Sequence, residues 1–297
     1  MTKTISTDLI VNTLSYHHEF SGSTFVVKLG GSIIHNESSI NAICSDLKLL
    51  QLSGINVILV HGGGKAITEE LSKQNITSQF VDGLRVTSKE AMQVIEMVLC
   101  GQINLMLVKK LNCAAVKAVG VSGADNSLLS CKSYSKKHCY VGIIEAVNAN
   151  YVKSILQSNQ SVEQIIPVIA PIGVDDKGNS FNINADYAAC ALANAIEANK
   201  LIYLTDQDGI YDNNGNVISE ISVVGLEQLI DTKVVDAGML TKSKSIIAAL
   251  CGHLNKVHIL NGNKQHALLR EIFTAEGVGT LCKKVINNFN KDIDELE

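Results

Sequence analysis

The sequence predicts an α/β protein with a largely parallel sheet, and two observations carry that prediction. Several apolar runs without polar alternation end in glycine or a polar residue, which is typical of strands buried on both faces. Helix-like stretches lie between these runs, and strands that alternate with helices form parallel sheets. No repeat, low-complexity tract or Pro/Gly-rich linker divides the chain. We therefore expect one continuous unit with two lobes.

The expected elements follow in chain order. The first strand, in the β-branched run 25–29, is stopped by two glycines and followed by a polar helical stretch. Further strands are expected in the apolar runs 57–60, 165–173, 201–205 and 256–261, and helices at 89–108 and 186–198. Clusters of Asp, Asn, Lys and Gly at 175–179 and 212–215 predict two hairpin turns.

Composition excludes several classes of protein. The 25 Lys and Arg against 29 Asp and Glu give a net charge of −4, whereas nucleic-acid binders carry a basic excess. No apolar run approaches the roughly 20 residues that cross a bilayer, and the first residues lack the apolar core of a secretory signal. We therefore expect a soluble cytoplasmic protein without nucleic-acid or membrane partners.

The eight cysteines point to neither metal nor redox chemistry. The closest two, Cys131 and Cys139, are eight residues apart, so the chain has no CxxC motif. Zinc and dithiol sites use such close pairs, and a cytoplasmic chain of this size does not depend on disulfides. We expect no metal site built by the protein alone.

Two glycine-rich strand ends suggest an anion-binding mouth. Lys28 precedes Gly30 and Gly31, and His61 precedes Gly62, Gly63 and Gly64. Helix N-termini beyond parallel strands direct N–H groups at ligands, and glycine permits close approach; each motif could equally be a tight turn. Lys28 would point into the mouth or extend to the surface. The P-loop and GxGxxG patterns are both missing.

Eight segments together resemble the amino-acid kinase family, and within it the N-acetylglutamate kinases. They run in the family's order from about residue 25 to 281 and read FVVKLGG (25–31), VHGGG (60–64), DGLRVT (82–87), IAPIGVDDKGNSFNINAD (169–186), LIYLTDQDGIYD (201–212), AGMLTKSKSI (237–246), KVHILNG (256–262) and HALLREIFTAEGVGT (266–280). The GLRVT and NINAD segments favour N-acetylglutamate over aspartate, carbamate or nucleoside monophosphate as substrate.

The resemblance implies a three-layer αβα sandwich with an open, mainly parallel central sheet. It also implies transfer of the ATP γ-phosphoryl group to the γ-carboxylate of N-acetyl-L-glutamate, the second step of arginine synthesis, with Mg²⁺ carried by the nucleotide. The substrate lobe would span 23–194 and the ATP lobe 195–297, after an oligomerisation segment at 1–22. The alternatives are a related kinase acting on N-acetyl-aminoadipate or aspartate, and a non-catalytic arginine sensor.

Residue roles carried over from the family place two catalytic lysines at Lys28 and Lys242. Asp186 would hold both ammonium groups in place and keep them protonated, or it could instead be a helix N-terminal acid. The resemblance assigns substrate binding to Gly63, Gly64, Arg85, Asn182 and Asn184, the last of which could cap a helix instead. It assigns ATP binding to Gly30, Gly31, Gly62, Thr205, Asp206, Gly209, Ile210 and Tyr211. The glycines would donate N–H groups to phosphoryl and carboxylate oxygens, while His61 is interpreted as structural.

Two features bear on control of the enzyme. Ala237 and Thr241 replace the glycine and proline usual before the second lysine in the family, which bears on the mobility of that loop. Residues 8–20 have helical spacing and resemble the helix that joins arginine-regulated members into hexamers, as trimers of dimers. We expect arginine as an effector, with candidate contacts at Tyr16, Lys200, His266, Glu276 and Gly279. A photosynthetic source would add the PII signalling protein as a partner, and an organelle-encoded chain would reside in the plastid stroma.

Overall fold

The computed structural model describes residues 18–81, 83–157, 164–235, 237–274 and 277–284. The expected N-terminal helix at 8–20 lies mostly outside the described residues; 18–20 are helical. The strands are β1 (Thr24–Leu29), β2 (Asn56–His61), β3 (Gln79–Val81), β4 (Leu84–Val86), β5 (Ala118–Ser122), β6 (Leu129–Ser133), β7 (Gly142–Val147), β8 (Ile166–Ala170), β9 (Ile172–Val174), β10 (Ser180–Asn182), β11 (Lys200–Thr205), β12 (Ile210–Tyr211), β13 (Val217–Ile218), β14 (Glu220–Ser222), β15 (Lys256–Asn261) and β16 (Gly279–Lys283).

The helices lie between these strands, as the alternating pattern predicts. They are α2 (Gly31–Ile34), α3 (Glu37–Leu52), α4 (Gly64–Lys73), α5 (Lys89–Glu96), α6 (Leu105–Cys113), α7 (Ala149–Gln157), α8 (Ala185–Ala195), α9 (Val223–Asp231), α10 (Ala237–Cys251) and α11 (Ala267–Phe273). A π-helical segment, Met97–Asn104, joins α5 to α6 without a break.

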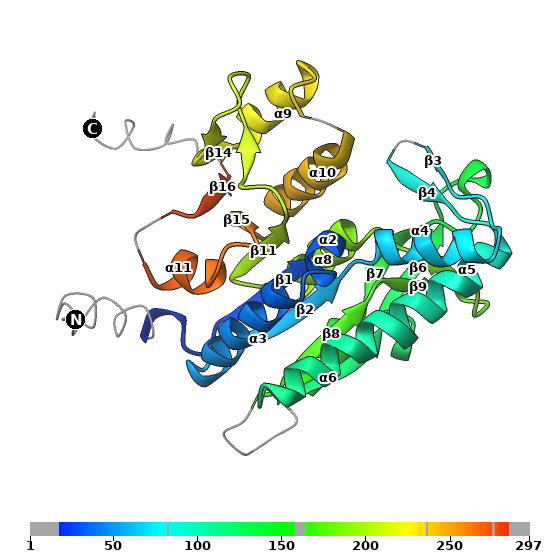
Figure 1. Cartoon of the computed structure of the whole chain (residues 1–297), viewed down its shortest axis with the longest axis horizontal. Coiled ribbons are helices and arrows are strands. Elements are labelled where there is room, and N and C mark those ends of the chain that lie inside the picture. The colour runs from blue at the N-terminus through cyan, green and yellow to red at the C-terminus, as the bar shows by residue number, and fades with distance from the viewer. Residues whose placement is uncertain (1–17, 82, 158–163, 236, 275–276, 285–297) are drawn as a thin grey trace, which may run out of the picture.

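An eight-stranded sheet in the order β14-β16-β15-β11-β1-β2-β8-β5 forms the middle of the molecule. The six strands from β15 to β5 are parallel to one another, whereas β16 runs antiparallel to β15. The prediction of an open, mainly parallel sheet is confirmed. Its central pair, β1 and β11, comes from the two halves of the chain, so the sheet continues through both expected lobes (Figure 1).

Alternation along the buried strands creates two hydrophobic cores, one on each face of the sheet. Phe25, Val27 and Leu29 of β1 pack in the core that is covered by α2–α6 and α11. Val26, between them, belongs to the opposite core, which is covered by α7–α10. Because successive side chains of a strand point to opposite faces, one apolar strand serves both cores. The three-layer αβα arrangement is thereby confirmed.

Two expected elements differ from the structure. The run 165–173 was predicted as one strand but forms β8 and β9, which belong to different sheets. Pro171 separates them and has no N–H to continue a strand ladder. The helix expected at 89–108 extends to Cys113. Both hairpin turns are confirmed, because the Asp175 N–H bonds to the Asn179 carbonyl and the Asp212 N–H to the Asn216 carbonyl.

The helix Lys89–Cys113 contains an 18-residue window that is, by length and composition alone, apolar enough to cross a membrane. The expectation that the chain has no such segment was therefore wrong by this measure. Half of that window is buried inside the protein, and Val98, Ile103 and Leu107 pack in the core beneath α3 and α4. This burial is typical of a core helix in a globular domain.

Candidate active site

Two adjoining cavities open at the carboxyl ends of the central strands. The first, of about 200 Å³, lies on the β2 side, and the second, of about 330 Å³, lies on the β11 side. Lys28, Gly31 and Asp186 line both. Parallel strands expose their ligand sites at this edge, so β1 delivers Lys28 to the junction of the two cavities.

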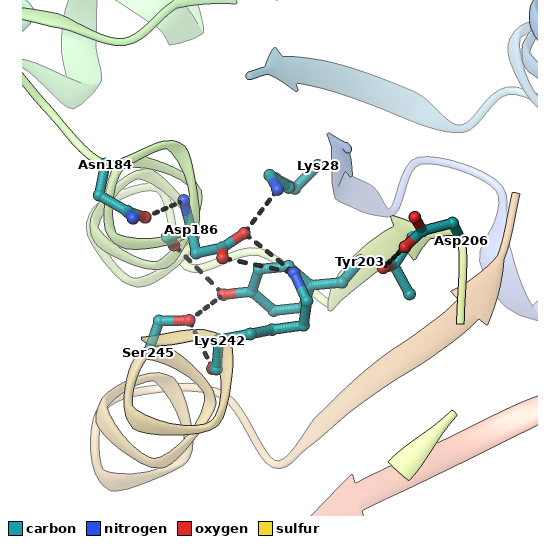
Figure 2. Close-up of polar contacts among 8 residues, drawn as sticks. Lys28, Asn184, Asp186, Tyr203, Asp206, Lys242 and Ser245 are labelled. Carbon is teal, nitrogen blue, oxygen red and sulfur yellow. Dashed lines mark hydrogen bonds and ion pairs between the residues drawn. The ribbon is translucent and has the colours of Figure 1, made fainter. Parts of the chain in front are cut away.

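The charged centre of this junction is one carboxylate between two ammonium groups (Figure 2). Asp186 Oδ1 lies 2.7 Å from Lys28 Nζ, and Lys242 Nζ lies 3.3 Å from each Asp186 oxygen. All three side chains are buried. They come from β1, the first turn of α8 and the first half of α10. The structure thus brings together residues that are at least 56 positions apart in the chain. We name Lys28, Asp186 and Lys242 the charge triad.

Burial and charge shift the pKa values of the charge triad in opposing ways. Burial alone would raise the pKa of Asp186, but Lys28 and Lys242 outweigh it and hold that pKa at about 2. Burial, reinforced by repulsion from Lys28, lowers the pKa of Lys242 to about 8 although Asp186 opposes the change. At pH 7 the triad therefore keeps one carboxylate and carries net positive charge toward both cavities.

The cavity on the β2 side is suited to a small carboxylate. Gly63 and Gly64 line it at the start of α4, where N–H groups have no intrahelical acceptor. Arg85 of β4 reaches the same cavity; its Nη2 donates to the Gly64 carbonyl at 2.9 Å and to Thr68 Oγ1 at 2.8 Å. A guanidinium fixed in this way places a permanent positive charge at the cavity, which favours a carboxylate there.

Two asparagines complete the polar lining of this cavity. Asn182 donates to Thr87 Oγ1 at 3.2 Å. The Asn184 side chain accepts the Asp186 N–H at 2.8 Å, so it caps α8 as the alternative interpretation allowed, and it also lines the cavity. By capping α8, Asn184 fixes the helix turn from which the Asp186 carboxylate projects.

Close packing of the glycine-rich turns leaves little room for side chains. A Cβ atom at Gly30 would lie 2.8 Å from the Leu204 carbonyl oxygen, and one at Gly63 would lie 2.6 Å from Ile103 and Leu99 methyl groups. The backbone also engages two N–H groups that were expected to face ligands. Gly30 donates to Leu204 at 2.8 Å and Gly62 donates to the Leu29 carbonyl at 3.1 Å. That part of the prediction was wrong, because strand-end hydrogen bonds already use both donors.

The cavity on the β11 side gathers most of the residues expected to bind nucleotide. Its lining includes Gly30, Gly31, Thr205, Asp206, Gly209, Ile210 and Tyr211, whereas Gly62 lines the other cavity. Apolar side chains of Val234, Val235 and Met239 complete the wall. A cationic floor beside an apolar wall suits an anionic group attached to a planar ring.

Acidic residues are sparse in this cavity. Asp206 accepts a hydrogen bond from Thr205 Oγ1 at 3.2 Å, and it lines the cavity together with Asp186. Among the described residues no group of three or more His, Cys, Asp or Glu side chains could hold a metal ion. Asp206 is the one carboxylate of this cavity lining outside the charge triad, which fits a Mg²⁺ ion that brings most of its ligands with it.

The described residues among the expected arginine contacts interact with different parts of the protein. The Lys200 ammonium lies 4.8 Å from the Phe20 ring centre, and Gly279 begins β16. His266 Nδ1 instead pairs with Asp46 at 2.6 Å. Tyr16 and Glu276 lie outside the described residues.

Several residues around the site were not identified from the sequence. Phe80 packs its ring 4.6 Å from the Arg85 guanidinium, and Ser78 accepts a hydrogen bond from Arg85 Nη1. Tyr203 lies under Lys242, with the ammonium 5.2 Å from the ring centre. The sequence offered one indication of this role. Tyr203 lies inside the apolar run 201–204, and a buried tyrosine hydroxyl requires a hydrogen-bond partner.

His61 is buried, and its pKa is lowered to about 4 by burial. Asn104 Nδ2 lies 3.2 Å from its Nε2 atom. A neutral imidazole held in this way agrees with the structural role expected for it.

Comparison with known proteins places these features in context. The model of the amino acid kinase family matches residues 23–261. An acetylglutamate kinase from Campylobacter curvus is 41% identical over 276 residues, which cover 93% of this chain and 96% of that protein. One from Kosmotoga olearia is 40% identical over 279 residues, covering 93% and 97%.

Solved structures share the fold at lower sequence identity. N-acetylglutamate synthase from Neisseria gonorrhoeae, complexed with coenzyme A and N-acetyl-glutamate, superimposes with a TM-score of 0.84 at 24% identity, over 95% of this chain and 64% of that chain. Its complex with coenzyme A and L-arginine gives a TM-score of 0.81 at 23% identity, over 94% and 66%. The chain thus spans about two thirds of the synthase, and this likeness concerns the fold alone.

Proposed function

The chain belongs to the amino acid kinase family, and we infer that it transfers the γ-phosphoryl group of ATP to the side-chain carboxylate of N-acetyl-L-glutamate. Acetylglutamate kinases about 40% identical over nearly the whole chain support this assignment. The reaction forms an acyl phosphate and belongs to arginine biosynthesis. The observation that carries the proposal is the charge triad, shared by a carboxylate-sized cavity and a larger neighbour.

The main obstacle to this reaction is the mutual repulsion of two anions. Catalysis of phosphoryl transfer consists largely of positioning and of stabilising charge on the transferred group. Lys28 lines both cavities and would contact the phosphoryl group from the substrate side, while Lys242 approaches from the nucleotide side. Asp186 holds both ammonium groups at fixed positions. The attacking carboxylate is ionised at pH 7, so no general base is needed.

The remaining polar groups would bind the two substrates. Arg85 and Asn182 would hold the α-carboxylate and amide of N-acetyl-L-glutamate, with the α4 N-terminus receiving its γ-carboxylate. The β11 side would bind ATP, with Mg²⁺ carried on the phosphates beside Asp206. The metal ion would neutralise phosphate charge and orient the transferred group.

A direct assay tests the assignment. Hydroxylamine converts the acyl phosphate formed from ATP, Mg²⁺ and N-acetyl-L-glutamate to a coloured hydroxamate, and N-acetyl-aminoadipate and aspartate serve as competing substrates. We expect turnover with N-acetyl-L-glutamate, and we expect Arg85→Lys to raise its KM about tenfold or more, because one bidentate contact is lost. Turnover confined to another carboxylate, in a folded protein, would reject the substrate assignment.

We further propose that arginine inhibits the enzyme and that the protein is a dimer or a hexamer in the cytoplasm. Support comes from the start of β11, where the Phe20 ring, the Lys200 ammonium and the Glu271 carboxylate provide aromatic, cationic and acidic groups. Such a set suits the guanidinium and carboxylate of arginine. The test is the same assay at millimolar arginine, combined with the mass in solution. Undiminished turnover, with a dimeric mass, would remove the effector and the hexamer together.

A further inference from the structure

A hydroxyl pair below the charge triad connects the two helices that carry Asp186 and Lys242. Tyr203 is buried in β11, and its hydroxyl lies 3.2 Å from the Asp186 carbonyl oxygen and 3.0 Å from Ser245 Oγ. Ser245 Oγ in turn donates to the Lys242 carbonyl at 2.7 Å. Figure 2 shows this path running from α8 through the tyrosine to α10.

We propose that Tyr203 and Ser245 are positioning residues for the phosphoryl transfer, and that they act by holding the Lys242 ammonium against Asp186 within reach of the phosphoryl group. This inference rests on the proposed function. The Tyr203 hydroxyl lies against the Asp186 backbone and the Ser245 hydroxyl against the Lys242 backbone, and the two hydroxyl oxygens are 3.0 Å apart. The Tyr203 ring centre lies 5.2 Å from the Lys242 ammonium. Neither residue lines either cavity at the site, so both act through Lys242.

The hydrogen-bond inventory favours a positioning role over simple filling of space. Two hydroxyl protons serve this path: Ser245 donates to the Lys242 carbonyl, and Tyr203 donates to Ser245 or to the Asp186 carbonyl. Each hydroxyl on the path therefore has an acceptor for its proton, as a buried polar network requires. Thr241, directly before Lys242, does not fix its backbone as a proline does. The hydroxyl path provides an anchor for the same turn from inside the protein.

The variants Tyr203→Phe and Ser245→Ala test this proposal, because each removes one hydroxyl and the first retains the ring. Ser243→Ala is the matched control, since Ser243 is buried in the same helix turn and its hydroxyl has no partner among the described residues. We expect each test variant to lower kcat about tenfold with the KM for N-acetyl-L-glutamate little changed, because a small misplacement of a catalytic group slows chemistry.

The double variant Tyr203→Phe/Ser245→Ala distinguishes a shared path from two separate effects. If the two hydroxyls act together, it should be no slower than the slower single variant, since the path is already broken. Ser243→Ala should keep the wild-type kcat. A loss of kcat no greater than that of the control, or a loss that only follows the folded fraction measured by circular dichroism, would overturn the proposal.

A measurement without substrates separates this inference from the proposed function. The pKa of Lys242 can be followed by NMR of ¹³Cε-labelled lysine, with its signal identified by its absence in Lys242→Met. Loosening the contact with Asp186 removes an attraction that favours the ammonium, so Tyr203→Phe should lower that pKa and Ser243→Ala should not. An unchanged Lys242 pKa in Tyr203→Phe overturns the positioning role, whereas a wild-type protein without turnover rejects the assigned reaction.

Discussion

Lys242 is a buried cation whose charge is needed for the proposed reaction and is disfavoured by its surroundings. Burial and Lys28 lower its pKa to about 8. Below that pH it is an ammonium, and above it the group becomes neutral and loses the charge that the proposed contact with the phosphoryl group requires. We expect kcat to fall as the pH rises through about 8. Between this pH and the unfolded-state pKa of about 10.4, the unfolded chain binds more protons at Lys242. Its contribution to stability therefore increases with pH in the same window.

The variant Lys242→Arg tests this behaviour, because a guanidinium stays charged throughout the accessible pH range. Its kcat should be about tenfold or more below wild type, since its shape differs from that of an ammonium. The decline of kcat above about pH 8 should be absent in this variant. Profiles of kcat from pH 6 to 10 for both proteins would measure the difference. A profile for Lys242→Arg with the wild-type alkaline decline would assign that decline to another group.

Asp186 contributes stability that depends on its charge. Burial raises its pKa, the two lysines lower it further, and the result is a pKa of about 2. Its stabilising effect is therefore complete above the unfolded-state pKa of about 3.9 and is lost as the pH falls through about 2. The difference corresponds to about 2–3 kcal/mol of unfolding free energy.

Replacement of Asp186 by Asn keeps the shape of the side chain but leaves two buried ammonium groups without a counter-charge. We expect the unfolding free energy at pH 7 to fall by about 3 kcal/mol and its dependence on pH between 4 and 2 to weaken. Urea denaturation at several pH values measures both quantities. The exposed Asp176→Asn is the control, and equal behaviour of the two variants would contradict the role of Asp186.

Single residues were predictable from the sequence where a motif identifies them. Lys28, Asp186 and Lys242 each lie in a segment that resembles the family, and the structure brings them together at one junction. The role proposed for Tyr203 and Ser245 could not be predicted from a motif, because it depends on a contact between residues that are 42 positions apart in the chain. The roles of Gly30 and Gly62 as N–H donors could not be judged either, since strand-end hydrogen bonds depend on the assembled sheet.

At the level of elements, strand and helix types followed from local sequence, whereas their ends depended on tertiary contacts. The alternation of β-branched runs and helical stretches predicted the central sheet. It did not predict the break at Pro171, because an apolar run continues across it. The long helix from Lys89 contains a π-helical segment that ends at Asn104. An added residue in a helix turn re-aims the side chains around it, and apolar spacing alone does not reveal it.

The π-helical segment gives its helix a polar contact with the sheet, and this contact can be tested. Asn104 Nδ2 donates to the Val168 carbonyl at 2.7 Å and lies 3.2 Å from His61 Nε2. Asn104→Ala would leave these buried groups without a partner, which costs about 1–3 kcal/mol of unfolding free energy. Because the pKa of His61 is lowered to about 4 by burial, protonation at pH 7 does not compensate.

Gln102→Ala is the control for this element, since Gln102 lies in the same π-helical segment and is exposed. It should change the unfolding free energy by less than about 0.5 kcal/mol. Chemical denaturation of both variants at pH 7 measures the difference. Equal stabilities would show that the Asn104 contact contributes nothing to holding this helix on the sheet.

The packing makes the proposed substrate lobe and ATP lobe one structural unit. β1 of the proposed substrate lobe pairs with β11 of the proposed ATP lobe over five residue pairs. Each hydrophobic core also includes residues of both halves. Leu59 shares a core with Leu204, and Val60 shares the opposite core with Leu250. Because side chains alternate across the sheet, no boundary between the lobes is free of buried apolar contacts.

Unfolding should therefore be a single cooperative transition, although the chain is long enough for two domains. Leu59→Ala lies in the substrate half and Leu250→Ala in the nucleotide half, and both side chains are almost fully buried. Each truncation should lower the unfolding free energy by about 2–5 kcal/mol and shift the same transition. Circular dichroism and calorimetry, with the van't Hoff enthalpy compared with the calorimetric one, would measure this. Two transitions, each shifted by only one of the variants, would instead mean that the lobes fold separately and that the sheet between β1 and β11 is their weakest contact.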